Sequence, residues 1–349
     1  VHNGASAAAG ELKRRLVARA GDTRLRRIDV AELAIERRRQ GRGFVYLRNG
    51  RPIRDDRLLH RLKRLAMPPA YEDVRYAESP QAHIQAIGLD NAGRVQYRYH
   101  SDWDKLREQR KARRLKELLR LLPKIRRVLG RHLRDREPTR GFALSAIIEL
   151  IALTALRPGS EVYAREHGTR GAATLLKSDV TLQGDRIALR FRGKGGKAIE
   201  REVRSRRLAR AIKLLQTLPG KRLFQYRTAD GALAVARRRD ANAFLHEIAS
   251  ADISLKDFRT LTACARALEN LVGVEPKSSD AGRRRQLKEC FCAVSAELAN
   301  TPAICRKSYV HAVVVRSFEN GSLQALAGPG RKNGEAMLRA LLGSTGALT

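Results

Sequence analysis

The stretch NTPAICRKSYVHAVVV, residues 300–315, brings three features together in one short segment. Asn-Thr-Pro is typical of a helix start. An Arg-Lys pair then precedes Tyr309, and the apolar run after it predicts the packing face of a helix. A phenol has an ordinary pKa of about 10 and is a weak nucleophile at neutral pH. Nothing in the segment itself activates Tyr309, so any reactivity has to come from residues elsewhere in the chain.

The charge of the chain indicates what it binds. Its 349 residues include 71 Lys and Arg against 36 Asp and Glu, a formal net charge of +35. Because these charges are spread over segments that look folded, they favour a polyanionic partner, usually nucleic acid. A solvated basic surface and an anionic membrane surface are the alternatives. The chain has no run of 18 uncharged apolar residues, which argues against a membrane span.

The cysteines predict neither a metal site nor a disulfide framework. No C-x-x-C pair occurs, and no nearby His pair has the spacing of a zinc site. Four cysteines in so long a chain do not resemble a secreted scaffold. We therefore expect reduced thiols in a cytoplasmic protein, without metal or cofactor. The cysteines are Cys264, Cys290, Cys292 and Cys305.

Changes in composition and hydrophobic pattern along the sequence predict that the chain is divided into four parts. A basic arm over 1–40 ends in a helix, read from DVAELAIERRRQ at 29–40. A β-rich domain over 41–103 contains alternating runs and Asn-Gly and Asn-Ala-Gly turns. A mainly helical domain covers 104–318, and a tail with one helix covers 319–349. The fold class is α+β.

The helical domain has two distinctive segments. Between residues 105 and 137, 14 Lys and Arg stand against 4 Asp and Glu, which predicts a basic helix. Residues 178–203 break the helical pattern and predict three short strands with glycine turns. We expect further helices at 143–156, 205–217, 241–251, 255–273 and 283–300, and a helix carrying Tyr309.

Four polar residues lie where a plain core would not place them. Arg157 follows the apolar helix expected at 143–156, and Lys194 is at the tip of a glycine-rich hairpin expected within 178–203. Arg259 is in LKDFRT, and Asn300 precedes Thr-Pro. Each alone has an ordinary explanation: a surface ion pair, a solvated lysine, or a helix N-cap by Asn300. Together they match attack on a phosphodiester. Arginines can neutralise the phosphate oxygens, a lysine can protonate the leaving oxygen, and a phenol can form a reversible ester.

The order of these motifs resembles the type IB DNA topoisomerases of the bacterial, poxvirus-like class. The resemblance covers about residues 41–318 and includes MPPAYEDV, HIQAIGLD and GRVQYRYH in the first domain. LKDFRT followed by NTPAICRKSYVH is its most specific part. It implies a two-lobed clamp around double-stranded DNA, with a catalytic lobe related to tyrosine recombinases. It also implies a monomer at the nucleoid that relaxes supercoils without ATP or metal.

The resemblance also implies roles for individual residues. Tyr309 attacks the backbone and becomes linked to a 3′-phosphate. Arg157 and Arg259 bind the scissile phosphate, and Lys194 is the general acid for the 5′-oxygen. Lys256 matches an accessory basic position. Asn300 stands where viral and eukaryotic relatives carry histidine, and is assigned as a hydrogen-bond donor to phosphate.

In the first domain, the resemblance assigns DNA contacts to Arg94, Gln96, Tyr97 and Tyr99. Period-2 spacing puts the two tyrosines on one strand face. The alternative is aromatic packing on a half-buried strand.

Some supporting positions depart from the family pattern. Tyr71, Leu261, Ala312 and Pro158 stand where relatives often carry Trp, Trp, Pro and Val. Sequence preference and local packing therefore do not carry over from the family.

Two other functions fit parts of the pattern. A tyrosine recombinase shares the nucleophile, but recombinases usually carry His-x-x-Arg where this chain has Lys256 and Arg259. A non-enzymatic DNA-binding protein would use Tyr309 only for packing and would form no covalent adduct.

Overall fold

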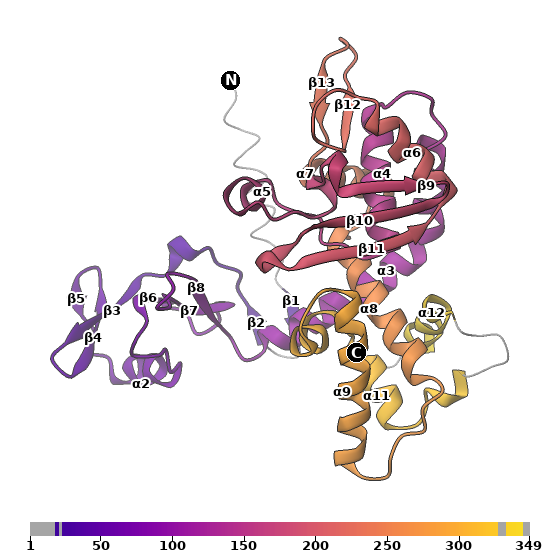
Figure 1. Cartoon of the computed structure of the whole chain (residues 1–349). Coiled ribbons are helices and arrows are strands. Elements are labelled where there is room, and N and C mark those ends of the chain that lie inside the picture. The colour runs from indigo at the N-terminus through magenta and orange to yellow at the C-terminus, as the bar shows by residue number, and fades with distance from the viewer. Residues whose placement is uncertain (1–17, 21–22, 327–332, 345–349) are drawn as a thin grey trace. The chain divides into compact units, whose positions relative to one another are not determined.

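The computed structural model describes residues 18–20, 23–326 and 333–344. Residues 1–17 and 21–22 of the arm predicted over 1–40, and part of the tail predicted over 319–349, lie outside these residues. The chain forms two compact units, of which the first ends at Arg110 and the second begins at Lys111 (Figure 1). Antiparallel sheets combined with helices confirm the α+β class.

The first unit is built on a six-stranded antiparallel sheet with one helix. Its hydrophobic residues form two clusters, and the larger includes Ile35, Tyr46, Leu62 and Tyr76. In spatial order the strands are β5 (Arg51–Pro52), β4 (Gly43–Arg48), β3 (Ile35–Gln40), β6 (Glu72–Tyr76), β7 (Ile84–Leu89) and β8 (Val95–Tyr99). The other elements are the pair β1 (Ala18–Ala20) and β2 (Thr23–Leu25), a 3₁₀ turn at Val30–Glu32, and helix α2 (Asp56–Arg64).

The helix predicted over 29–40 is wrong. After the short 3₁₀ turn, residues Ile35–Gln40 form strand β3, which pairs with β4 and β6. The physical reason is the burial of Ile35, which is fully buried between two partner strands, while Arg38 and Arg39 further along the strand stay exposed. Tertiary pairing outweighs the helical propensity of a segment rich in Ala, Glu and Arg.

The second unit is mainly helical, with one three-stranded sheet and one small hairpin. Helix α3 (Trp103–His132) runs from the first unit into the second. The helices that follow are α4 (Arg140–Thr154), α5 (Glu161–His167), α6 (Arg206–Gln216), α7 (Arg238–Ala249), α8 (Leu255–Leu271), α9 (Asp280–Glu297), α10 (Pro302–Ile304), α11 (Ala312–Glu319) and α12 (Gly334–Ser344). The strands are β9 (Val180–Gln183), β10 (Arg186–Arg192), β11 (Ala198–Arg204), β12 (Gln225–Arg227) and β13 (Leu233–Val235). Short 3₁₀ turns lie at Ala172–Thr174, Lys177–Asp179, Lys194–Gly196 and Gln324–Leu326, and a π-turn at Cys305–Tyr309.

Helix α4 is the centre of this unit because it is apolar over most of its surface, apart from the buried Ser145 and Glu149, of which Glu149 pairs with Arg207. Its residues from Phe142 to Ile151 are buried, and it contacts α6, α7 and α8. A helix without a polar face has to be enclosed by other elements. It ends at Ala155, which adopts the left-handed conformation with φ of 51° and directs the chain into Arg157.

The three predicted strands after α4 are confirmed as β9, β10 and β11, paired in that order. On β10, Ile187, Leu189 and Phe191 alternate with more exposed residues and are buried. The sheet lies beside α4 and α6 (Figure 1), so its apolar face is covered by helices. The β10–β11 turn carries Lys194.

Helix α12 packs against α8, the helix that carries Arg259. The two approach closely at Gly334, whose N–H donates to Glu269 Oε1 at 2.9 Å. A β-carbon at Gly334 would meet the Ala265 carbonyl oxygen at 2.3 Å and its carbon at 2.6 Å. Only a residue without a side chain fits there.

We therefore expect Gly334→Ala to lower the free energy of unfolding by about 1–3 kcal/mol, the usual cost of overpacking. Gly343→Ala is the control in the same helix, because a β-carbon there meets nothing within 4 Å. It should be neutral or stabilising by up to about 1 kcal/mol. Denaturant titration of both variants measures the difference, and equal midpoints would contradict the close approach.

Candidate active site

Arg157 lies in the loop that follows α4 and reaches the end of α9. Its Nη1 and Nη2 both lie 3.3 Å from the Ala299 carbonyl oxygen, and Nη2 also donates to Asn300 Oδ1. Burial and the neighbouring charge of Arg259 lower the pKa of Arg157, whereas Tyr309 raises it. The guanidinium is thus half-buried beside another positive charge without a carboxylate among these contacts.

Two glycines allow the backbone of this loop to double back on itself. A β-carbon at Gly171 would lie 2.4 Å from the Arg157 carbonyl oxygen and 2.6 Å from the Gly159 nitrogen. Gly159 has a φ of 90°, which L side chains rarely adopt. Ala172 N–H donates to the Arg157 carbonyl at 2.8 Å and closes the arrangement.

Arg259 is the most buried cation of the site, at 2% exposure. Its Nη1 donates to the Ala155 carbonyl at the end of α4, and its Nη2 to the Leu298 carbonyl at the end of α9, at 3.0 Å. Its Nε is buried and has no hydrogen-bond partner among the described residues. The guanidinium carbon lies 5.1 Å from the centre of the Tyr309 ring.

A third arginine, Arg201 on β11, also binds the end of α9, through the Ala296 carbonyl at 3.1 Å and the Glu297 carbonyl. Burial is the largest cause of the lowered pKa of Arg201. The last carbonyls of a helix lack intrahelical partners and lie at its negative end. The C-terminal end of α9 is therefore the common acceptor for all three guanidinium groups.

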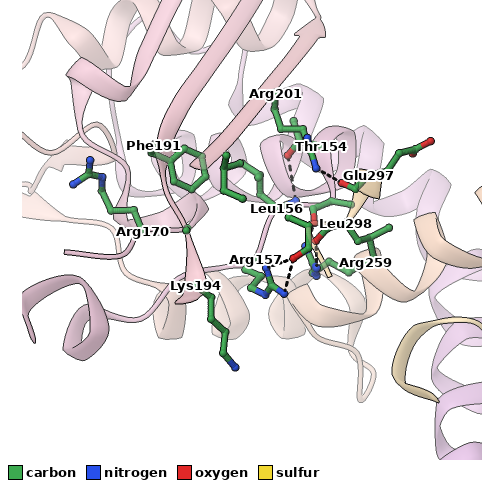
Figure 2. A pocket seen from close by; sticks show the side chains of 15 residues that line it. Thr154, Leu156, Arg157, Arg170, Phe191, Lys194, Arg201, Arg259, Glu297 and Leu298 are labelled. Carbon is green, nitrogen blue, oxygen red and sulfur yellow. Dashed lines mark hydrogen bonds between the residues drawn. The ribbon is translucent and has the colours of Figure 1, made fainter. Parts of the chain in front are cut away.

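These residues border one small cavity of about 20 Å³. Figure 2 shows Arg157 and Arg259 next to each other below Leu298, and Lys194 extending from the hairpin away from them. Lys194 is exposed at its position in the β10–β11 turn. Like charges repel, so a lysine without an anion to bind has no reason to approach two guanidinium groups.

Asn300 does not cap the helix before Tyr309. Thr301 is the N-cap, and its side chain accepts from Ile304 N–H. The side-chain oxygen of Asn300 instead accepts from Arg157, while its Nδ2 is buried without a partner among the described residues. The contact with Arg157 thus occupies Asn300 Oδ1, the acceptor that an N-cap would need, and leaves Asn300 Nδ2 available as a donor.

Tyr309 ends a short helical segment. This segment is separate from the helix that the apolar run after Tyr309 forms. Residues Pro302–Ile304 form α10, and Cys305–Tyr309 form a π-turn closed by Val310 N–H on the Cys305 carbonyl at 3.0 Å. The apolar run belongs to α11, which starts at Ala312. Tyr309 is 9% exposed, so its ring is packed against the protein.

The electrostatic environment favours ionisation of Tyr309. Burial raises the pKa of its phenol. The charge and hydrogen bonding of Arg259, followed by the charges of Lys256 and Arg157, lower that pKa by more than burial raises it, so the net pKa lies below the ordinary value. Lys256 is exposed on the first turn of α8, three residues before Arg259. Three cations thus act on one buried phenol.

The structure thus brings Arg157, Arg259, Asn300 and Tyr309 together through their contacts. Lys194 borders the same cavity, and Lys256 acts on the phenol only through its charge. Sequence reasoning missed Arg201, which lies on a strand among other charged residues. Arg201 is half-buried on β11 between more exposed neighbours. Alternation along the predicted strand could have indicated that Arg201 faces inward, and this is the one sequence signal for it.

The four residues of the first unit predicted to contact DNA lie on strand β8 and just before it. Arg94 and Gln96 both bind the Asp90 carboxylate, at 2.9 and 2.8 Å, and the hydrogen bond from Arg94 is the largest cause that lowers the pKa of Asp90 to about 2. Tyr97 and Tyr99 share a strand face and stack at 5.8 Å with an interplanar angle of 10°. They are 46% and 37% exposed, and Tyr99 also stacks on Trp103, so both the DNA-contact prediction and the packing alternative stay open.

Two further observations concern the described residues as a whole. Within ranges 18–20, 23–326 and 333–344, no group of three or more His, Cys, Asp or Glu is placed to hold a metal ion. In the same part of the chain, every helix is too short or too polar to cross a bilayer.

The charges around Tyr309 predict a measurable pKa. Because cations stabilise the phenolate, the Tyr309 phenol should titrate below about 10, the usual tyrosine value. Arg157→Gln removes one of these charges and should raise that pKa. The difference in ultraviolet absorbance between the wild type and Tyr309→Phe, followed with pH, isolates this one phenol.

Lys197→Gln is the matched control, because it removes a positive charge in the β10–β11 turn that is not among the charges acting on the phenol. The electrostatic account is contradicted if Tyr309 titrates above the usual value, or if both substitutions shift it equally.

Two family models match this chain. The model described as the catalytic core of eukaryotic DNA topoisomerase I matches residues 96–325, and that of the N-terminal domain of bacterial DNA topoisomerase IB matches residues 43–90. The first covers the whole arrangement around Tyr309, and the second covers most of the sheet of the first unit.

A curated relative agrees with both. The DNA topoisomerase 1B of Acanthamoeba polyphaga mimivirus is 30% identical over 269 residues, which cover 75% of this chain and 80% of the viral protein. The resemblance seen in the sequence is confirmed, and the chain belongs to the type IB DNA topoisomerases.

Proposed function

We propose that this topoisomerase relaxes duplex DNA by cutting one strand through a covalent 3′-phosphotyrosyl bond to Tyr309, allowing rotation, and resealing the strand without ATP or a metal ion. The observation that supports the proposal most directly is the buried Tyr309 phenol beside Arg259, with a pKa lowered by cations. A packing tyrosine needs no such surroundings.

In the proposed cleavage step, Tyr309 Oη attacks the phosphorus and loses its proton to solvent. The bond from phosphorus to the 5′-oxygen breaks, and Lys194 donates a proton to that oxygen. The products are a phosphotyrosyl ester and a free 5′-hydroxyl. Resealing reverses these transfers, and because the ester keeps the energy of the broken bond, no nucleotide cofactor is required.

The phosphate oxygens would be bound by donors that have no other partner. Arg259 Nε and Asn300 Nδ2 are both buried and unsatisfied among the described residues. Such groups are costly to bury, by about 1–3 kcal/mol each, unless a ligand completes their hydrogen bonding. With Arg157, they supply charge and directed donors at the place where charge develops, which is the role a metal would otherwise fill.

The two lysines would complete the site when DNA binds. Lys194 sits on a turn with glycines of positive φ at positions 195 and 196, so its backbone is not confined by side chains on the residues that follow. A phosphate between it and the arginines would replace repulsion with attraction. Lys256 would act as an accessory charge on the phenol.

We further propose that the two units act as the halves of a clamp, as the resemblance implies, with a catalytic lobe related to tyrosine recombinases. The first unit would contact DNA through Arg94, Gln96, Tyr97 and Tyr99. Duplex DNA as substrate fits the net charge of +35 and predicts binding that weakens with salt. The parts at 1–40, 41–103, 104–318 and 319–349 stay a prediction, as do a monomeric state and association with the nucleoid.

The decisive experiment combines relaxation with trapping of the intermediate. The wild type should relax a supercoiled plasmid in EDTA without ATP. On DNA labelled on the cleaved strand, detergent should capture a protein adduct at the 3′-phosphate. Tyr309→Phe should lower the rate of relaxation by several orders of magnitude and form no adduct, because the nucleophile is lost. DNA binding should persist, because the arginines are kept.

Each arm of this experiment can overturn the proposal. Plasmid that stays supercoiled in EDTA excludes the metal-independent reaction. An adduct formed by Tyr309→Phe excludes Tyr309 as nucleophile, and joint molecules between two duplexes point to a recombinase.

The role of Lys194 has its own test. Lys194→Ala should slow cleavage by about 10²–10⁴-fold, the usual contribution of a general acid. A substrate with sulfur in place of the bridging 5′-oxygen should restore most of the rate, because a thiolate leaves without a proton. Lys197→Ala is the control in the same turn and should cleave both substrates normally. A Lys194→Ala defect of the same size on the sulfur substrate would assign Lys194 to phosphate binding.

A further inference from the structure

The thiol of Cys264 lies directly against the backbone that carries the nucleophile. Its Sγ lies 3.4 Å from the Tyr309 carbonyl oxygen, and the His311 N–H donates to the same sulfur at 3.3 Å. A thiol can serve as weak donor and weak acceptor at once, so the two contacts are compatible. Cys264 is fully buried, so water does not compete for either.

The two contacts flank the one residue at which the chain changes direction. Tyr309 ends the π-turn, Val310 is extended with φ of −76° and ψ of 127°, and His311 is the N-cap of α11. A carbonyl at a helix end and an N–H at an N-cap both lie outside the regular helical hydrogen bonding. The Cys264 sulfur meets both groups and so spans the bend on either side of Val310.

Cys264 also belongs to the same helix as two of the three cations that act on the phenol. Helix α8 carries Lys256, Arg259 and Cys264. Arg259 and Cys264 are five residues apart, about 7.5 Å along the axis of one helix. The helix therefore sets the separation between the charge that faces the Tyr309 ring and the sulfur that contacts the Tyr309 backbone.

We propose that Cys264 is a positioning residue for the nucleophile, which holds the Tyr309 backbone on α8 at the distance where Arg259 acts on the phenol. This inference rests on the proposed role of Tyr309. The thiol takes no part in bond making or breaking. Its function is to keep the phenol in register with the phosphate-binding cations, where a displacement of about 1 Å can cost 10²-fold in rate.

The test is single-turnover cleavage of labelled duplex DNA at saturating enzyme. Cys264→Ala should lower the cleavage rate constant by about 10–100-fold and leave the Kd for DNA within about twofold, because the phosphate-binding residues are untouched. The pH dependence of cleavage should move to higher pH, since a displaced phenol is less stabilised by Arg259. Cys264→Ser keeps a donor and acceptor and should recover most of the rate.

Cys290→Ala is the matched control. Its buried thiol lies on α9, contacts the Ala267 carbonyl at 3.8 Å and lies near Cys305, but the two backbone groups that flank Val310 contact Cys264 instead. The loss of stability from removing a buried thiol should be similar in the two alanine variants. The cleavage rate and the pH dependence should change only in Cys264→Ala.

The outcomes separate this inference from the proposed function. If the wild type forms no adduct at Tyr309, the proposed function fails. If the wild type forms the adduct and Cys264→Ala matches it in rate and pH dependence, the positioning role fails. If Cys264→Ala does not fold, Cys264→Val fills the space without a polar group, and a Val variant as fast as the Ser variant overturns the inference.

Discussion

The site depends on the hydrogen bonds between three arginines and the C-terminal carbonyls of α9. Arg259 and Arg157 could instead have been held by carboxylates, but a carboxylate would neutralise the charge that a phosphate needs. Carbonyls hold the guanidinium groups in place and leave their charge intact. Hydrogen bonds to a charged group contribute about 1.5–3 kcal/mol each, whereas a helix end contributes about 0.3–1 kcal/mol in most settings. The directed hydrogen bonds therefore offset more of the cost of burying these cations than the helix end does.

The same arrangement determines how ready the site is without DNA. Arg157, Arg259, Asn300 and Tyr309 already meet around the ends of α4 and α9, although they are far apart in the sequence. Lys194 remains outside, on an exposed turn. In the proposed mechanism, the phosphate-binding part is therefore preorganised, and Lys194, the proposed proton donor, is the part that would have to move. Such a division keeps the buried phenol from being paired with every catalytic group before a substrate is present.

The sequence predicted the α+β class, the three-stranded sheet and the polar residues around Tyr309, because the apolar periodicity and the family motifs are strong there. It failed at 29–40, where pairing of Ile35 with two strands decides the structure and local propensity does not. It also offered a helix N-cap as the ordinary explanation of Asn300, because a sequence cannot show that Arg157 takes that side-chain oxygen. Cys264 and Arg201 bind backbone atoms distant in sequence, and backbone contacts leave no mark on residue type. These are the features for which coordinates were needed.

The direction of the Tyr309 side chain depends on the number of residues in the π-turn that ends at Tyr309. Thr301 anchors one end of the segment and Val310 the other, and the turn accommodates one residue more than an α-helical turn would. Loss of any single residue between them would restore α-helical geometry and rotate the phenol by about 100° around the axis. Exchanges of side chain within the segment leave that angle unchanged. Insertions and deletions there should consequently be far rarer among functional sequences than substitutions.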